Sequence, residues 1–137
     1  MTLFKSKTEI KIPFFDLDPM GIVWHGNYVK YMEIARCDMF SKLNYTYKTM
    51  KEEGIVYPVA KMETKFIEPL VFEQDIVVET HLVEIEPAII IKYLFFDKKT
   101  NKKVFKGQTM QIGVNALSKE TIYNAPDNLK AALKKIN

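Results

Sequence analysis

The chain has 137 residues, of which 47% are hydrophobic and 27% are charged, and its formal net charge is +3. This composition is ordinary for a folded globular protein, and it predicts a single domain spanning residues 1–137. A chain of this size buries roughly two thirds of its unfolded surface, so its core needs no metal or disulfide cross-link. The only cysteine, Cys37, excludes an internal disulfide and is typical of a reducing compartment.

The sequence disfavours a membrane-spanning helix, a secretory signal and a nucleic acid partner. No apolar run approaches the ~20 residues that a membrane-spanning helix needs. The first residues alternate charged and apolar side chains, whereas a secretory signal has a continuous apolar stretch. We therefore expect a cytoplasmic protein with no transmembrane segment. The basic charge comes from 19 lysines and one arginine, Arg36, and because base recognition relies on bidentate arginine, we expect no nucleic acid partner.

The first predicted element is a strand from Lys7 to Phe14. Its residues alternate, and Ile10, Ile12 and Phe14 share one face. The alternation ends in residues 15–21, which contain two aspartates, a proline and a glycine. These residue types predict a loop after the strand.

A long helix is predicted to begin at Asn27, because the period of the apolar residues changes there. They recur at spacings of four, three, four and four, at Tyr28, Met32, Ala35, Met39 and Leu43. Three more apolar residues widen this stripe, namely Tyr31, Ile34 and Phe40. We therefore expect the helix to be covered on most sides.

Period-two patterns dominate the rest of the chain and predict four strands, around residues 62–66, 76–82, 89–95 and 104–114. Shorter helical stretches are expected at Tyr47–Glu53 and at Pro126–Lys135, where proline stands near the first turn. Hairpin-like intervals between the strands favour an antiparallel meander. The predicted fold class is α+β, a curved antiparallel sheet packed on one nearly buried helix.

The densest polar cluster, residues 16–28, lies between the first strand and the long helix. A loop that enters a helix N-terminus offers unpaired backbone N–H groups, which favour an oxyanion. Asp16, Asp18 and His25 can supply a base or nucleophile there, although both aspartates also suit turn positions. His25 and His81 lack the paired spacing of a zinc site, and we expect no metal ion or cofactor. Cys37 is expected to be an inert core residue.

The sequence resembles hotdog-fold acyl-CoA thioesterases through two consecutive motifs, Asp16-x-Asp18-x-x-Gly21-x-Val23-x-His25-x-x-Tyr28 and Tyr31-Met32-Glu33-x-Ala35-Arg36. The most similar branch is the 4-hydroxybenzoyl-CoA thioesterase family, with its relatives associated with the Tol-Pal system. This resemblance implies a hotdog fold, in which a five-stranded antiparallel sheet wraps around one long central helix. It also implies a homodimer or homotetramer whose sheets pair edge to edge, with active sites at the interface.

The resemblance further implies hydrolysis of an acyl-CoA substrate to a free carboxylic acid and CoA. Asp18 is then the catalytic carboxylate, as nucleophile or general base, and His25 assists it. The backbone amides of His25 and Gly26 are expected to hold the oxyanion, with Tyr28 positioning the substrate. Trp24 and Tyr31 are further candidates to line an acyl pocket.

Glu33 is an alternative carboxylate, because another branch of hotdog thioesterases carries its acid on the long helix. We favour a structural role, since Glu33 can pair with Arg36 three residues later. Two other functions remain open: a hotdog dehydratase, and a non-catalytic protein that binds acyl-CoA. The complete motif around Asp18 favours hydrolysis over both.

A lysine-rich segment follows the third of the four later strands. We expect it to form a turn whose lysines contact the phosphates of CoA, namely Lys98, Lys99, Lys102 and Lys103. The alternative is a solvated hairpin in which lysines protect the strand edges.

Overall fold

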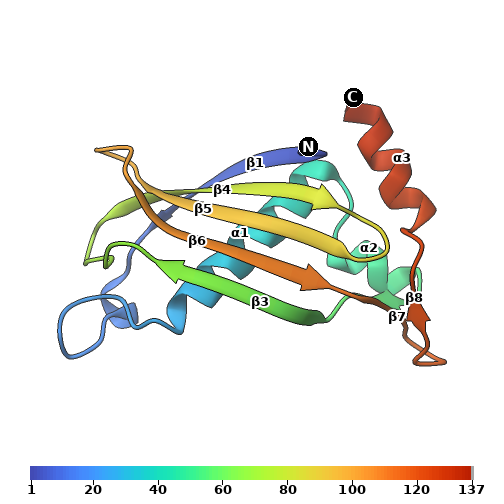
Figure 1. The fold of residues 1–137 in the computed structure, drawn as a ribbon, viewed down its shortest axis with the longest axis horizontal. Coiled ribbons are helices and arrows are strands. Elements are labelled where there is room, and N and C mark those ends of the chain that lie inside the picture. Colours follow the sequence, from blue (N-terminus) through green and yellow to red (C-terminus); the bar gives the residue numbers. More distant parts are fainter. Residues whose placement is uncertain (137) are drawn as a thin grey trace.

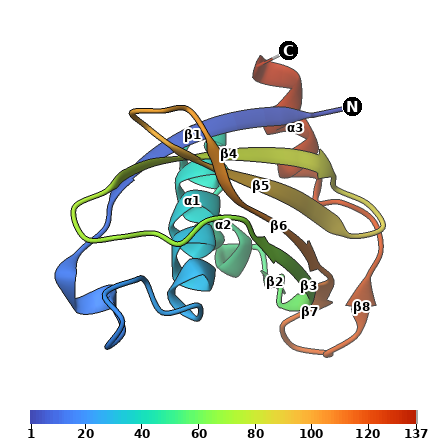
Figure 2. The ribbon, with the colours of Figure 1, turned by 60° about the vertical axis from the view of Figure 1, so that its left-hand side comes forward.

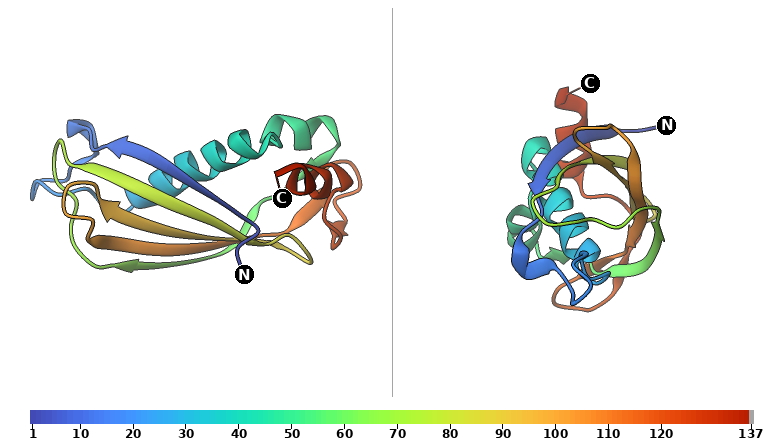
Figure 3. Two further views of the ribbon diagram at one scale, coloured as in Figure 1. Left: turned by 90° about the horizontal axis from the view of Figure 1, so that it is seen from above. Right: turned by 90° about the vertical axis from the view of Figure 1, so that its left-hand side faces the viewer.

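The computed structural model describes residues 1–136, in which a five-stranded antiparallel sheet curves around helix α1 (Asn27–Leu43). In sheet order the strands are β1 (Phe4–Lys11), β4 (Asp75–Glu84), β5 (Ile89–Asp97), β6 (Lys103–Gln111) and β3 (Val59–Phe66). Figure 3 shows that the sheet forms one layer and wraps partly around α1, which forms the other. The predicted α+β arrangement of one curved sheet and one long helix is confirmed.

The remaining elements are short and lie mostly at the end of the molecule that holds the C-terminal end of α1 (Figure 1). They are η1 (Phe14–Asp16), α2 (Tyr47–Glu52), β2 (Ile55–Val56), β7 (Gly113–Asn115), β8 (Thr121–Ile122) and α3 (Asp127–Ile136). Strands β2, β7 and β8 form a small second sheet that the sequence did not predict. Among the described residues, no helix is both long and apolar enough to cross a membrane.

The predicted stripe of α1 is the centre of the core. All five of its residues are buried, namely Tyr28, Met32, Ala35, Met39 and Leu43. Tyr31 and Phe40 are buried as well, whereas Ile34 is 43% exposed. The apolar face of the helix is therefore narrower than the sequence suggested on the side of Ile34.

The first strand differs from the prediction at both ends. It begins at Phe4 and ends at Lys11, and Phe14 lies in η1, where it is 71% exposed. Pro13 has no N–H to extend the ladder, and the Leu17 N–H donates to the Phe14 carbonyl at 3.2 Å. The chain therefore turns before Phe14 can join the buried face of the strand.

The order of the strands departs from a simple meander. Only β4, β5 and β6 follow one another in space, while β3 pairs with β6 at the edge of the sheet. Cα register places Phe66 of β3 opposite Phe105 of β6. Except for the partly buried Met62, the residues of β3 are exposed, so this edge strand is open to solvent.

Cys37 is exposed on α1, so the expectation of a core cysteine was wrong. It falls between the buried positions of the helix, because the apolar stripe follows neighbouring positions such as Ala35 and Met39. Partial desolvation is the main cause that raises the pKa of its thiol. The thiol is therefore protonated at neutral pH.

The sheet approaches α1 very closely at Gly107 on β6. A Cβ atom at this position would lie 2.7 Å from the Met32 sulfur and 3.2 Å from a ring carbon of Phe105. Such distances are shorter than ordinary van der Waals contacts. A glycine here lets the helix lie against the centre of the sheet.

We predict that Gly107→Val lowers the free energy of unfolding by about 1–3 kcal/mol, because the larger side chain overpacks the contact between helix and sheet. Urea denaturation followed by circular dichroism measures the change. Gly107→Ala should cost less, since only the flexible end of Met32 must move to admit one methyl group. Equal stability of wild type and Gly107→Val would contradict the close approach.

Candidate active site

The loop between β1 and α1 holds Asp18 in a tight turn. The Gly21 N–H donates to the Asp18 carbonyl at 3.0 Å, and the Asp18 N–H donates to the Ile22 carbonyl at 2.8 Å. Gly21 has a positive φ of 80°, which glycine adopts without strain. Asp18 Oδ1 accepts a hydrogen bond from the Met20 N–H at 2.8 Å, whereas Oδ2 accepts none from the described residues. The turn thus fixes the carboxylate and leaves one oxygen available.

Asp16 has a different environment, although it stands only two residues earlier. It is 3% exposed, and its carboxylate accepts hydrogen bonds from Tyr31 Oη at 2.7 Å and Lys30 Nζ at 2.5 Å. Burial, and then the bond to Asp16, raise the pKa of Tyr31, so its hydroxyl stays a donor. The Asp16 carbonyl also accepts from Asn27 Nδ2 at 2.9 Å. Asp16 therefore ties the loop to the first turns of α1.

The N-terminus of α1 has no side-chain cap, because its N-cap residue is Gly26. Within the described residues, neither the His25 N–H nor the Gly26 N–H donates a hydrogen bond. A Cβ on Gly26 would lie 2.2 Å from a ring carbon of Trp24, so glycine lets the indole lie over this end of the helix. Two unpaired donors therefore stand at the positive end of the helix dipole.

A cavity of about 390 Å³ lies between this loop, the start of α1 and the end of β3. It contains the predicted site residues Asp18, His25 and Tyr28. The rest of its lining is Met20, Ile22, Val23, Phe66, Ile67, Glu68 and Pro69. The structure thus brings the predicted carboxylate, histidine and tyrosine to one largely apolar cavity.

Aromatic rings form one side of this cavity. The ring of Tyr28 packs edge-on against Phe66, with centroids 4.8 Å apart, and lies 4.9 Å from the ring of Phe105. The Tyr28 hydroxyl accepts a hydrogen bond from the Leu70 N–H at 3.3 Å. Desolvation by burial raises the pKa of Tyr28, although the bond from Leu70 lowers it in part. Tyr28 is therefore a neutral, immobilised ring.

The segment after β3 supplies the lining that sequence reasoning missed, including Glu68. Its backbone is fixed, because the Ile67 and Glu68 N–H groups both donate to the Val104 carbonyl at 3.0 Å. The Val23 N–H donates to the Leu70 carbonyl at 2.9 Å, which joins the segment to the Asp18 loop. No local motif marks Glu68. Only the pairing of β3 with β6 brings it to the same cavity as Asp18.

Other candidate residues lie outside this cavity. Glu33 forms an ion pair with Arg36 and is absent from the cavity lining, which agrees with the structural role we favoured. Trp24 and Tyr31 do not line it either. Among residues 1–136, no group of three His, Cys, Asp or Glu side chains is placed to hold a metal ion.

The four candidate lysines lie in or beside the turn between β5 and β6. This turn and the Asp18 loop lie at the same end of the molecule, as Figures 1 and 2 show. Lys98 forms an ion pair with Glu9 at 3.0 Å. Among the described residues, no ion pair occupies Lys99, Lys102 or Lys103. None of the four lines the cavity itself.

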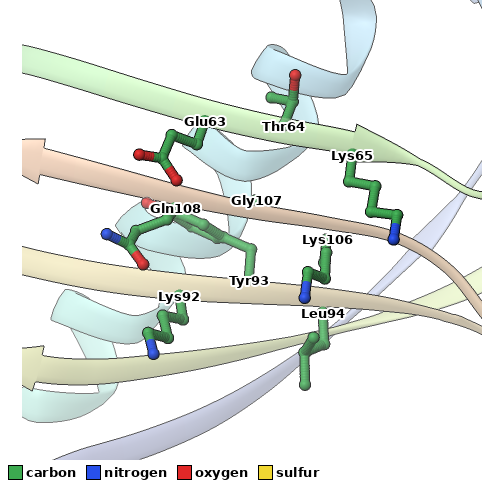
Figure 4. A pocket seen from close by; sticks show the side chains of 9 residues that line it. All are labelled: Glu63, Thr64, Lys65, Lys92, Tyr93, Leu94, Lys106, Gly107 and Gln108. Carbon is green, nitrogen blue, oxygen red and sulfur yellow. The ribbon is translucent and has the colours of Figure 1, made fainter.

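A second hollow of about 300 Å³ lies against β3, β5 and β6 (Figure 4). Several of its side chains stand on the face of the sheet that is turned away from α1, among them Glu63, Lys92 and Lys106. No residue predicted for the site lines this hollow. Its charged side chains are therefore separate from the Asp18 cavity.

Residues 12–133 match the thioesterase-like superfamily. The chain belongs to this superfamily. It is 35% identical to the Bacillus subtilis protein YneP over 55% of this chain and 54% of that protein. It is 25% identical to the Haemophilus influenzae acyl-CoA thioesterase YbgC over 90% of both chains. The chain thus spans about half the length of YneP, and 60% of the Helicobacter pylori acyl-CoA thioesterase YbgC.

Solved structures of several thioesterases have the same fold. The DHNA-CoA thioesterase from Staphylococcus aureus is 26% identical, with a TM-score of 0.85 over 96% of this chain and 90% of that one. A 4-hydroxybenzoyl-CoA thioesterase shares the fold at 18% identity, with a TM-score of 0.82 over 94% of this chain and 98% of that one. These similarities confirm the hotdog fold that the sequence resemblance implied.

We predict that Asp16→Asn lowers the free energy of unfolding by about 1–3 kcal/mol, because it weakens hydrogen bonds to a buried carboxylate. Asp18→Asn is the matched control, since the same chemical change falls on a partly exposed turn. Urea denaturation of both variants measures the difference. A greater loss of stability for Asp18→Asn would contradict the structural role assigned to Asp16.

Proposed function

We propose that this chain is a single domain that hydrolyses acyl-CoA thioesters to a carboxylic acid and CoA in the cytoplasm. The observation that carries the proposal is a cavity lined by Asp18, whose Oδ2 accepts no hydrogen bond from the described residues, and by His25. The N–H groups of His25 and of the adjacent Gly26 donate no hydrogen bond within the described residues. The names of the YbgC relatives support this activity.

The reaction needs attack on the thioester carbonyl carbon and stabilisation of the oxygen that becomes negative. The N–H groups of His25 and Gly26 are suited to the second task, and losing one such donor in other enzymes costs about 3–4 kcal/mol. The CoA thiolate is a good leaving group, so no strong general acid is required. The helix N-terminus therefore supplies most of the electrostatic stabilisation of the oxyanion.

Two routes start from Asp18 Oδ2. As a nucleophile, it adds to the carbonyl carbon and expels CoA thiolate, and water then hydrolyses the mixed anhydride. As a general base, it takes a proton from a water molecule that attacks the same carbon. His25 orients water or substrate in both. Label in Asp18 after a single turnover in isotopically labelled water establishes the nucleophilic route, because a general base exchanges no oxygen. The label enters when water attacks the Asp18 carbonyl of the anhydride.

The activity is tested with short aliphatic, long aliphatic and aromatic acyl-CoAs, with release of the CoA thiol as the readout. Cys37 is an exposed thiol that reacts with the same reagents. A Cys37→Ser variant therefore provides the clean background for the assay. Failure of all three substrate classes would contradict the proposed hydrolysis.

We predict that Asp18→Asn lowers kcat by about 100-fold or more, because the amide can neither attack nor accept a proton. Circular dichroism should show an intact fold, since the substitution preserves the size of the side chain. Asp16→Asn should reduce kcat less, measured below its unfolding transition. The assignment of the two aspartates is wrong if this ranking reverses.

We predict a homodimer or a dimer of dimers. The exposed edge strand β3 leaves backbone groups unpaired at the border of the sheet, and two copies can pair through it with twofold symmetry. Light scattering should give a mass about twice or four times the 16.0 kDa of the chain. A single 16.0 kDa species at assay concentration would exclude this assembly.

We predict that the lysine turn binds the phosphates of CoA. Substitution of Lys98, Lys99, Lys102 and Lys103 by alanine should raise KM for an acyl-CoA but not for the same acyl group on pantetheine, which lacks the nucleotide. Each exposed contact contributes only about 0.2–1 kcal/mol, so the four are removed together.

The matched control for the lysine turn removes four exposed lysines of α2 and α3, two helices near the opposite end of the molecule (Figure 1). They are Lys48, Lys51, Lys134 and Lys135. This control variant should keep the wild-type KM for both substrates. Equal effects of the turn variant on acyl-CoA and on acyl-pantetheine would assign its lysines to an ordinary solvated hairpin.

A further inference from the structure

Two carboxylates, not one, line the Asp18 cavity. Glu68 is exposed at its wall, and its side chain makes no ion pair or hydrogen bond with any described residue. No lysine or arginine lines this cavity, and His25 is the one lining side chain there that can become a cation. An acyl group in the cavity therefore meets two carboxylates within a lining that is otherwise largely apolar.

The position of Glu68 is set by the scaffold. Its N–H donates to the Val104 carbonyl of β6 at 3.0 Å, and Pro69 follows it directly. The next residue, Leu70, bonds to the Tyr28 hydroxyl through its N–H and to the Val23 N–H through its carbonyl. The segment that carries Glu68 is thus anchored to the sheet, the helix and the Asp18 loop. The backbone at Glu68 is therefore held at the cavity wall.

Glu68 has no evident structural purpose at this position. Glu9 and Glu63 pair with Lys98 and Lys61. Within the described part of the chain, Glu52 and Glu84 are unpaired like Glu68, but they do not line the Asp18 cavity. An unpaired carboxylate beside the proposed catalytic Asp18 repels any further negative charge, and it does so more strongly in a partly desolvated cavity than in bulk water.

We propose that Glu68 is a specificity-determining residue that restricts the site to acyl groups without a carboxylate. This inference rests on the proposed thioester hydrolysis and names its substrate class. An uncharged acyl group packs against Tyr28 and Phe66, which favours it by burial of apolar surface. A dicarboxylic acyl group brings its terminal carboxylate into the field of Asp18 and Glu68, so its binding is penalised.

Butyryl-CoA and succinyl-CoA provide the matched test, because they have the same number of acyl carbons and the same CoA. The ratio of their kcat/KM values isolates the terminal carboxylate from every contact of the CoA portion. Wild type should prefer butyryl-CoA. Glu68→Gln should shift the ratio toward succinyl-CoA by about 3- to 10-fold, as expected for removing one charge at short range. The shift should appear mainly in KM and shrink at high ionic strength.

Glu63→Gln is the matched control. It removes the same charge from β3 only five residues earlier, and Figure 4 places this side chain in the second hollow, outside the Asp18 cavity. Its substrate ratio should equal that of wild type.

The outcomes distinguish a failure of the Glu68 role from a failure of the proposed hydrolysis. Hydrolysis of butyryl-CoA with an unchanged ratio in Glu68→Gln overturns the role of Glu68 and leaves the proposed function standing. Equal use of both substrates by wild type does the same. Failure of the wild type to hydrolyse any acyl-CoA overturns the proposed function and the inference with it. An equal shift in Glu63→Gln shows a general effect of net charge and also overturns the inference.

Discussion

The burial of α1 inside the curve of the sheet is the constraint on which the rest of the structure depends. The helix can lie this close because Gly107 places no side chain against Met32. Its apolar stripe packs on the sheet, and its N-terminus follows the loop from β1. That end meets the loop from β1 and the segment after β3, and the cavity forms where these three parts join.

The two aspartates of one short loop have different roles, one structural and one chemical. Asp16 is buried and bonded to Lys30 and Tyr31, so its charge is compensated inside the protein. Asp18 takes its hydrogen bonds from its own turn and keeps one oxygen free at the cavity. The first carboxylate holds the loop on the helix, and this attachment keeps the second in place. An identical residue type therefore has opposite environments within two positions.

Sequence periodicity predicted the elements that bury one face. The stripe of α1 and the alternating strands β4 and β5 follow directly from it, and the motif around Asp18 located the loop, His25 and Tyr28 that meet at the cavity. Periodicity does not predict features that depend on the pairing of distant strands. The position of β3 beside β6 has no local signal, and without that pairing Glu68 has no visible relation to Asp18.

The cavity joins residues 18–28 to residues 66–69, two stretches separated by nearly the whole length of α1, α2 and β3. Contacts between such distant stretches are entropically costly and are therefore slow to form during folding. A partly folded chain with α1 and a β4–β5 hairpin would still have no cavity. A ligand of this cavity therefore recognises only the completed fold, and it would raise the midpoint of thermal unfolding by mass action.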